Sequence, residues 1–117
     1  MSSFKKTYSL FDRNSEASRV LIKYPDRVPV ICERSYSAPK DCPLIDKNKY
    51  LIPRDLTVGQ FIYVIRKRMH LPAEKAIFIF INNNIPASNH MIGELYEYYR
   101  DADNFLYVTY SFENTFG

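Results

Sequence analysis

The chain has 117 residues, enough for one domain whose core needs neither disulfides nor metals. Its 46% hydrophobic and 25% charged residues are typical of a soluble globular protein, and no apolar run is long enough for a membrane span or a signal peptide. The net charge of +3 is too small to indicate nucleic-acid binding by itself, and two cysteines suit a reducing compartment. We therefore expect a cytoplasmic protein.

The first predicted element is an amphipathic helix near the N-terminus. Ser9 is suited to cap it, because an acidic residue follows three positions later. Pro25 ends the helix. The preceding segment, 2–8, is expected to be irregular or a single helical turn. The apolar positions that recur at helical spacing are Leu10, Ala17, Val20, Leu21 and Tyr24.

A β-rich apolar run at 28–32 predicts the first strand. Pro29 cannot donate to a strand ladder, so it is expected near the start of the strand. Cys32 is expected in the core as a small apolar residue. The following segment, 35–46, is rich in Ser, Pro, Lys and Asp, which predicts an exposed loop that carries Cys42.

The second predicted strand covers 47–52 and is closed by Pro53. Its lysines and its terminal proline are features of an edge strand, where they discourage pairing with other chains. The two strands are expected to form an antiparallel pair with a long connection.

A capping box formed by Thr57 and Gln60 opens a second amphipathic helix, which ends near His70. Tyr63 and Val64 are apolar as well, so this helix carries more apolar surface than one core-facing stripe requires. Three basic residues in the last turn suit the helix dipole.

An apolar run at 77–81 predicts a strand covered on both faces, followed by a short helix near 92–99 and a last strand at 105–110. A hairpin, a crossover helix and a final strand beside the first describe an α+β fold, the ubiquitin-like β-grasp, with a four-stranded mixed sheet. The strands at 28–32 and 77–81 are expected to be buried on both faces, and the N-terminal helix is expected to supply the second cover.

Six blocks of the sequence can be compared with known families: KYPDRVPVI (23–31), KYLIP (49–53), DLTVGQF (55–61), IRKR (65–68), FLY (105–107) and ENTFG (113–117). These blocks closely resemble the autophagy ubiquitin-like modifiers, the family of GABARAP and microtubule-associated protein light chain three. The resemblance covers nearly the whole chain and implies an N-terminal helical extension at 1–26, a ubiquitin-like core at 27–112 and a conjugation tail at 113–117.

The resemblance implies a modifier and not an enzyme. Gly117, which has no Cβ, is slender enough to thread an enzyme channel. By resemblance, its carboxylate is the acyl donor that becomes joined to phosphatidylethanolamine, and Phe116 is gripped by the enzymes. The implied partners are ubiquitin-like activating and conjugating enzymes and a processing or deconjugating cysteine protease. No catalytic residue, cofactor or metal is expected. The implied location is cytoplasmic, and on autophagosomal or other membranes after lipidation.

The resemblance also implies a recruitment site, in which cargo receptors with an aromatic-x-x-aliphatic motif add a strand to the edge at 49–52. The first pocket, for the aromatic residue, would consist of Glu16, Val20, Pro29, Ile31, Lys49, Leu51 and Phe105. The second pocket, for the aliphatic residue, would consist of Tyr50, Ile52, Pro53, Leu56, Phe61, Val64 and Ile65. The basic residues that would attract acids flanking the motif are Arg27, Lys47, Lys49, Arg66 and Arg68.

Simpler roles remain open for these residues. Ile31, Leu51, Phe61 and Ile65 could be ordinary core residues, Phe105 could close the edge of the core, and 66–68 could be a solvated helix end. The chain also departs from the family pattern. The loop at 35–46 is slightly longer, 98–100 reads Tyr-Tyr-Arg, and Val20 and Val64 are smaller than the usual pocket residues. We expect these departures to affect which partners the site prefers, and not the way in which it binds them.

Two other function classes compete with the modifier. An enzyme would need Cys32 or Cys42 beside His70 or His90, and nothing in the spacing brings them together. A nucleic-acid or filament binder would use the basic residues at 23–27 and 66–68, but no aromatic residues alternate with them as in a base-stacking platform. The alternative function is a ubiquitin-like adaptor that is not conjugated and binds tubulin, microtubules or trafficking proteins. The family resemblance keeps tubulin open, because the family includes microtubule-associated members.

Overall fold

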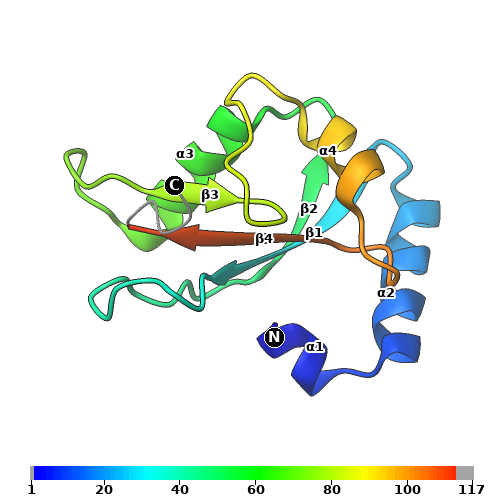
Figure 1. The fold of residues 1–117 in the computed structure, drawn as a ribbon. Helices are drawn as coiled ribbons and strands as arrows, with labels where there is room; N and C mark the ends of the chain where they lie inside the picture. Colours follow the sequence, from blue (N-terminus) through cyan, green and yellow to red (C-terminus); the bar gives the residue numbers. More distant parts are fainter. Residues whose placement is uncertain (1, 113–117) are drawn as a thin grey trace.

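The computed structural model describes residues 2–112 and contains four strands and four helices in that range. The elements are α1 (Ser3–Thr7), α2 (Leu10–Lys23), β1 (Arg27–Arg34), β2 (Lys49–Pro53), α3 (Val58–Met69), β3 (Phe78–Phe80), α4 (Ile92–Tyr99) and β4 (Leu106–Ser111) (Figure 1). All the predicted elements are therefore present, and the segment before the first long helix is a single short helix. No helix in residues 2–112 is long and apolar enough to cross a membrane.

The strands form one mixed sheet in the order β2-β1-β4-β3. β1 and β2 pair antiparallel, β1 and β4 pair parallel, and β3 and β4 pair antiparallel. The parallel pair places the last strand beside the first, as the β-grasp prediction requires. The fold class predicted from the sequence is confirmed, and β2 lies at an edge of the sheet.

Local sequence signals explain where the helices begin. The Ser9 side chain accepts a hydrogen bond from the amide of Asp12, which caps α2. Thr57 and Gln60 form the predicted capping box of α3, with both reciprocal hydrogen bonds present. α3 ends at His70, which adopts the left-handed conformation and donates its amide to carbonyls of the last turn.

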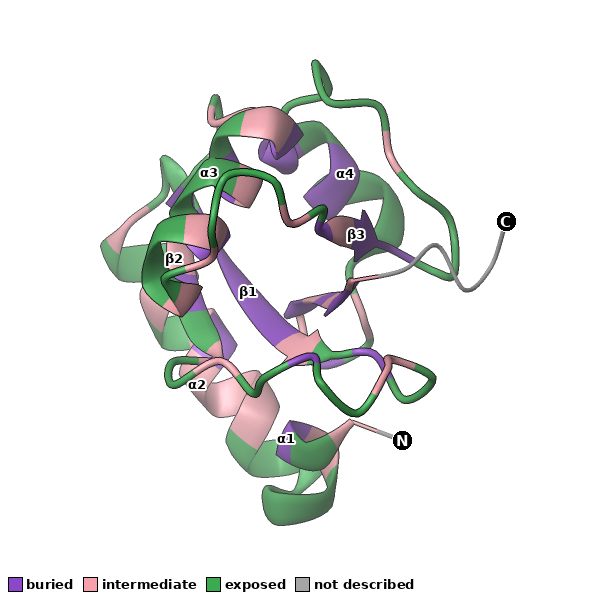
Figure 2. Cartoon of the chain, turned by 90° about the vertical axis from the view of Figure 1, so that its left-hand side faces the viewer, coloured by how far each residue is buried: buried purple, intermediate pink, exposed green. Residues whose placement is uncertain are grey.

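The sheet separates two clusters of buried side chains. Val28, Val30 and Cys32 of β1 point toward α3 and belong to the larger cluster. Ile31 points to the other face and packs in a smaller cluster with Phe4 of α1, Ala17 of α2 and Phe105. The N-terminal helices thus cover β1, as predicted, and Figure 2 shows the middle of β1, residues 28–32, as buried. At the far edge, Ile79 of β3 belongs to the larger cluster.

Two details differ from the sequence-based expectation. The run at 77–81 forms a strand of only three residues, because Ile81 instead bridges to Asn84 in a tight turn. The loop at 35–46 is not exposed throughout, since Ser35 and Cys42 are both buried. The prediction of a solvent-exposed Cys42 is wrong because Tyr110 fastens this loop to the sheet, donating to the carbonyl of Pro43 at 2.7 Å.

Candidate functional site

The exposed side of β2 is the first component of the site. In the described part of the chain β2 pairs with β1 alone, so the backbone groups along its outer side are available for another strand. Successive side chains of a strand point to opposite faces. Tyr50 and Ile52 enter the larger cluster below α3, while Lys49 and Leu51 lie on the face of α2. A strand added at this edge would therefore meet two separate apolar surfaces.

The first predicted pocket lies between α2 and β2. The Lys49 Nζ is 2.6 Å from the Glu16 Oε2, which bridges the two elements at the surface. Strand pairing brings Pro29 opposite Leu51, and Ile31 opposite Lys49. Glu16 of α2 is thus joined to Lys49 of β2, and the two pocket residues of β1 lie directly opposite the two pocket residues of β2.

Phe4, which the sequence analysis did not select, contacts the floor of this pocket. Its ring lies edge-on to Phe105, with centroids 5.2 Å apart, and the Lys49 Nζ lies 5.6 Å from its centroid. Ile31 and Phe105 are consequently only 0% and 1% exposed, whereas Leu51 is partly accessible. Ile31 and Phe105 form a supported floor, and the more accessible residues form the walls. The one available signal was a lone apolar side chain between polar residues at 2–7.

The second predicted pocket lies between β2 and α3. Tyr50, Ile52, Phe61 and Ile65 are all buried, and the rings of Tyr50 and Phe61 meet edge to face with centroids 5.7 Å apart. These four side chains are core residues, which agrees with the simpler role left open for Phe61 and Ile65. The accessible rim of the predicted pocket consists of Pro53, Leu56 and Val64.

Tyr50 has an unusual hydroxyl group. The side chain is buried, and its oxygen has no hydrogen-bond partner among residues 2–112. Burial raises the pKa of this phenol above its ordinary value, so the group stays protonated. Leaving a buried donor unpaired costs free energy, which makes this position less favourable than the rest of the cluster.

The basic residues assigned to the flanks of the site differ in their local contacts. The Lys47 Nζ lies 5.0 Å from the centroid of the Tyr50 ring, and the Arg68 Nε lies 3.0 Å from the Asp46 Oδ1. The Arg27 guanidinium lies over the ring of Tyr24. These cations are placed at the surface, where they can attract an acidic ligand.

Arg66 has a different environment. Its guanidinium donates to the carbonyls of Lys75 at 2.6 Å, Pro72 at 2.8 Å and Ala73 at 3.1 Å. These bonds attach the segment after α3 to the helix itself, and they leave few donors for a ligand. A structural role for Arg66 is therefore visible alongside its predicted role in binding.

Neither cysteine has the environment of a nucleophile. Burial raises the pKa of the Cys32 thiol and also that of the Cys42 thiol, so the reactive thiolate is disfavoured in both. Both histidines, His70 and His90, are exposed. In residues 2–112 no group of His, Cys, Asp or Glu is arranged to hold a metal ion.

A cavity of about 750 Å³ is lined by residues of α1, β1, β4 and the loop at 35–46. The Glu33 carboxylate in this cavity already accepts from the Ser2 hydroxyl at 2.6 Å and from the Phe4 amide at 3.0 Å. Glu33 therefore serves to anchor α1. The predicted conjugation residues Phe116 and Gly117 lie outside the described residues.

The β-grasp sheet, with β2 at one edge between two apolar surfaces, places the chain in the class of ubiquitin-like proteins. The sequence model described as autophagy protein Atg8, ubiquitin-like, matches residues 12–117. The chain belongs to the ATG8 family, whose members are ubiquitin-like modifiers of autophagy.

Relatives match along the full length of the chain. It is 56% identical to autophagy-related protein 8 of Mycosarcoma maydis, covering 99% of this chain and 97% of the relative. It is also 56% identical to autophagy-related protein 8c of Arabidopsis thaliana, covering 99% and 96% of the two chains.

Solved structures agree with this fold. The crystal structure of Trypanosoma brucei ATG8 matches with a TM-score of 0.89 and 41% identity, covering 95% of this chain and 94% of that one. Plasmodium falciparum Atg8, in complex with an Atg3 peptide from the same organism, matches with a TM-score of 0.87 and 34% identity over 97% and 98% of the chains.

Proposed function

We propose that this protein is conjugated through the carboxylate of Gly117 to the amine of phosphatidylethanolamine, and that it then recruits partners to the membrane. The carboxylate would first displace pyrophosphate from ATP to form an adenylate. An enzyme thiol would then displace AMP to form a thioester. The lipid amine would finally attack the thioester, forming an amide and releasing the thiol. Family membership supports this chemistry, which needs no catalytic residue in the chain itself.

The product of this reaction would be firmly attached to a membrane. A single acyl chain gives only marginal, reversible membrane binding, whereas two chains give stable anchoring. Phosphatidylethanolamine carries two acyl chains, so one covalent bond would convert a freely diffusing domain into a resident membrane protein. We propose in addition that 1–26, the helical extension, and 27–112, the ubiquitin-like core, form the body that becomes attached to the membrane. The segment 113–117 would be the tail that the conjugation enzymes bind.

Recruitment would use the open edge of β2, and this edge is the observation that carries the proposal. A partner strand would pair with the backbone of β2 and place its aromatic and aliphatic anchors on the surfaces beside α2 and α3. Each buried anchor contributes roughly 1.5–3 kcal/mol to binding. This gain must exceed the entropic cost of ordering the flexible peptide. We therefore expect dissociation constants near the micromolar range, about −8 kcal/mol.

The partners proposed for the edge are cargo receptors with aromatic-x-x-aliphatic motifs. Basic side chains around the edge favour acidic residues next to the motif. The complex between the Plasmodium falciparum relative and an Atg3 peptide supports a further partner, the conjugating enzyme. Activating enzymes and a deconjugating cysteine protease complete the set that the chemistry requires.

Intact-mass analysis of the protein recovered from cells tests the conjugation. We expect a membrane-pelleting form that carries the added mass of one phospholipid on its final residue, and we expect Gly117→Ala to abolish this form. An unaltered lipidated form in the Gly117→Ala protein would refute the proposal for the tail.

Peptide titration tests the edge. Leu51→Arg should abolish binding of an aromatic-x-x-aliphatic peptide, because it places a charge where an apolar anchor would be buried. Tyr98→Arg is a matched control, since Tyr98 is 84% exposed on α4 and belongs to neither predicted pocket. Circular dichroism would check that both variants are folded. Retained peptide binding by the Leu51 variant, or an equal loss in both, would contradict the proposed site.

A further inference from the structure

Phe112 is the last described residue, and 113–117 follow it directly in the sequence. Its side chain is partly buried and packs against the larger apolar cluster. The Lys75 Nζ lies 4.5 Å from the centroid of its ring, which is a cation–π geometry. The residue from which the proposed conjugation tail departs is therefore held by a specific side-chain contact.

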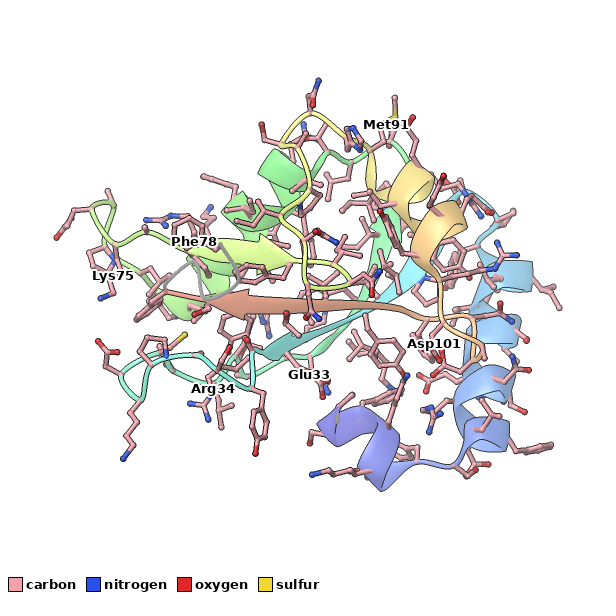
Figure 3. The ribbon with its side chains drawn as sticks, in the orientation of Figure 1. Glu33, Arg34, Lys75, Phe78, Met91 and Asp101 are labelled. Atoms are coloured by element: carbon pink, nitrogen blue, oxygen red, sulfur yellow. The ribbon has the colours of Figure 1, made fainter. Side chains whose placement is uncertain are left out.

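Lys75 is itself fixed by two other segments. Its Nζ is 3.8 Å from the Asp41 Oδ2 in the loop at 35–46, and its carbonyl accepts from the Arg66 Nη1 at 2.6 Å. Both the side chain and the backbone of Lys75 are thus restrained. Figure 3 shows Lys75 beside the C-terminal end of β4.

The loop at 35–46 also contacts Phe112 directly. Cys42 is buried in the larger cluster, and its thiol interacts with the backbone amide of Phe112. The Arg34 Nη1 donates to the carbonyl of Cys42 at 2.9 Å, which attaches this part of the loop to the end of β1. The loop that departs from the family pattern in length therefore packs against the root of the tail.

We infer that Lys75, oriented by Asp41, is a positioning residue for conjugation, because it fixes the point from which the tail leaves the body. This inference rests on the proposed function. Five residues span at most about 17 Å, so the position of Phe112 limits where the Gly117 carboxylate can reach. Fixing this position raises the fraction of enzyme-bound proteins whose carboxylate lies near the reacting group.

The test is a reconstituted conjugation reaction with activating enzyme, conjugating enzyme, ATP and vesicles containing phosphatidylethanolamine. We expect Lys75→Ala to lower kcat about two- to fivefold, the factor that corresponds to the loss of about 0.5–1 kcal/mol of cation–π interaction. KM should stay unchanged, because the folded body would bind the enzyme through other surfaces. Lys75→Arg should retain the rate, since a guanidinium also stacks on an aromatic ring.

Two variants separate positioning from other roles of Lys75. Lys40→Ala removes one positive charge from the neighbouring loop, where Lys40 is exposed, and should leave kcat and KM unchanged. Phe112→Leu removes the ring while Lys75 remains, and it should lower kcat to a similar extent. In the Lys75→Ala/Phe112→Leu double variant we expect no further loss, because both changes remove the same contact.

Failure of this inference and failure of the proposed function would give different results. Additive losses in the double variant would show that Lys75 acts through the enzyme and not through Phe112, which would overturn the inference. Wild-type kinetics for Lys75→Ala would overturn it as well. Absence of any lipid conjugate from the wild-type protein, with enzymes that conjugate another family member, would instead refute the proposed function.

Discussion

The two faces of the sheet are covered in different ways. Among the described residues, the face toward α3 rests on a cluster of eighteen buried side chains, whereas the face toward α1 and α2 rests on a cluster of four. The smaller contact is reinforced by polar interactions, including Lys5 with Asp101 at 2.7 Å and Arg13 with Asp103 at 2.8 Å.

This difference indicates separate roles for the two faces. An extensive apolar cluster gives cooperative stability, because its energy scales with the area removed from water. A small aromatic contact with ion pairs can open locally at a lower cost than global unfolding. The first predicted pocket adjoins the smaller cluster, so its shape depends on the more weakly held part of the molecule.

The largest expected effect is the loss of Phe61 from the α3 face. Phe61→Ala should lower the free energy of unfolding by about 3–5 kcal/mol, because the ring is fully buried and packs against Tyr50. Urea unfolding followed by circular dichroism measures this change. Tyr63→Ala on the exposed side of the same helix serves as the control and should cost less than about 1 kcal/mol. Comparable losses in the two variants would contradict the assignment of α3 to the main core.

Phe4→Ala tests the opposite face and should have a smaller effect. We expect a loss of about 3 kcal/mol at most, since the cavity would open onto a helix that can move away. Amide hydrogen exchange should accelerate at 3–7 but remain slow in β1 and α3. A uniform acceleration across the sheet would show that the two faces unfold as one unit, which would remove the distinction between them.

The third effect concerns the Tyr110 hydroxyl, which attaches the loop at 35–46 to the α3 side. It donates to the Pro43 carbonyl at 2.7 Å and accepts from the Ile45 amide at 2.8 Å. Tyr110→Phe should lower the free energy of unfolding by about 1–3 kcal/mol near pH 7, because the partly buried Pro43 carbonyl and Ile45 amide both lose this partner. Tyr36→Phe is the control, since Tyr36 is 98% exposed.

The Tyr110 effect should also depend on pH. Burial raises the pKa of Tyr110 to about 12 in the folded protein, compared with about 10 for an unfolded tyrosine. Between these values the unfolded chain loses its proton while the folded chain keeps it, so stability declines as pH rises from about 10 to 12. The stability difference between wild type and Tyr110→Phe should therefore shrink in this range, as unfolding at pH 7 and pH 11 would measure. A constant difference would contradict this prediction.

Features set by neighbouring residues were predictable from the sequence. The Ser9 cap, the capping box at Thr57 and the prolines that end a helix and a strand act within a few residues, so their patterns are visible without tertiary information. The edge position of β2 followed from its lysines and Pro53 for the same reason. These signals, together with the resemblance, were sufficient for the element order and the fold class.

Features set by distant contacts were not predictable. Cys42 lies in a polar segment, and its burial depends on Tyr110 and Arg34, which only the folded sheet brings near it. Phe4 stands alone among polar residues, and its role depends on Phe105 at the other end of the chain. The resemblance supplied a set of pocket residues, but it could not distinguish a buried floor such as Ile31 from an accessible wall such as Leu51.

The smallest expected effect is at the Glu16–Lys49 pair, which crosses from α2 to the β2 edge at 2.6 Å. Both side chains are partly exposed, so Glu16→Gln should change the free energy of unfolding by less than about 1 kcal/mol, and less in high salt. Its effect on binding should be clearer. Without Glu16, the Lys49 ammonium is free to pair with an acidic residue that precedes the aromatic anchor of a peptide.

We therefore expect Glu16→Gln to bind such an acidic peptide about two- to fivefold more tightly at low salt, and to lose this advantage as salt increases. Glu97→Gln is the matched control, because Glu97 of α4 pairs with Arg100 at 3.3 Å and belongs to neither predicted pocket. A gain of affinity in both variants would reflect net charge alone. A gain restricted to Glu16→Gln would show that the weakly held N-terminal face controls access to the first pocket, since this ion pair joins that face to the binding edge.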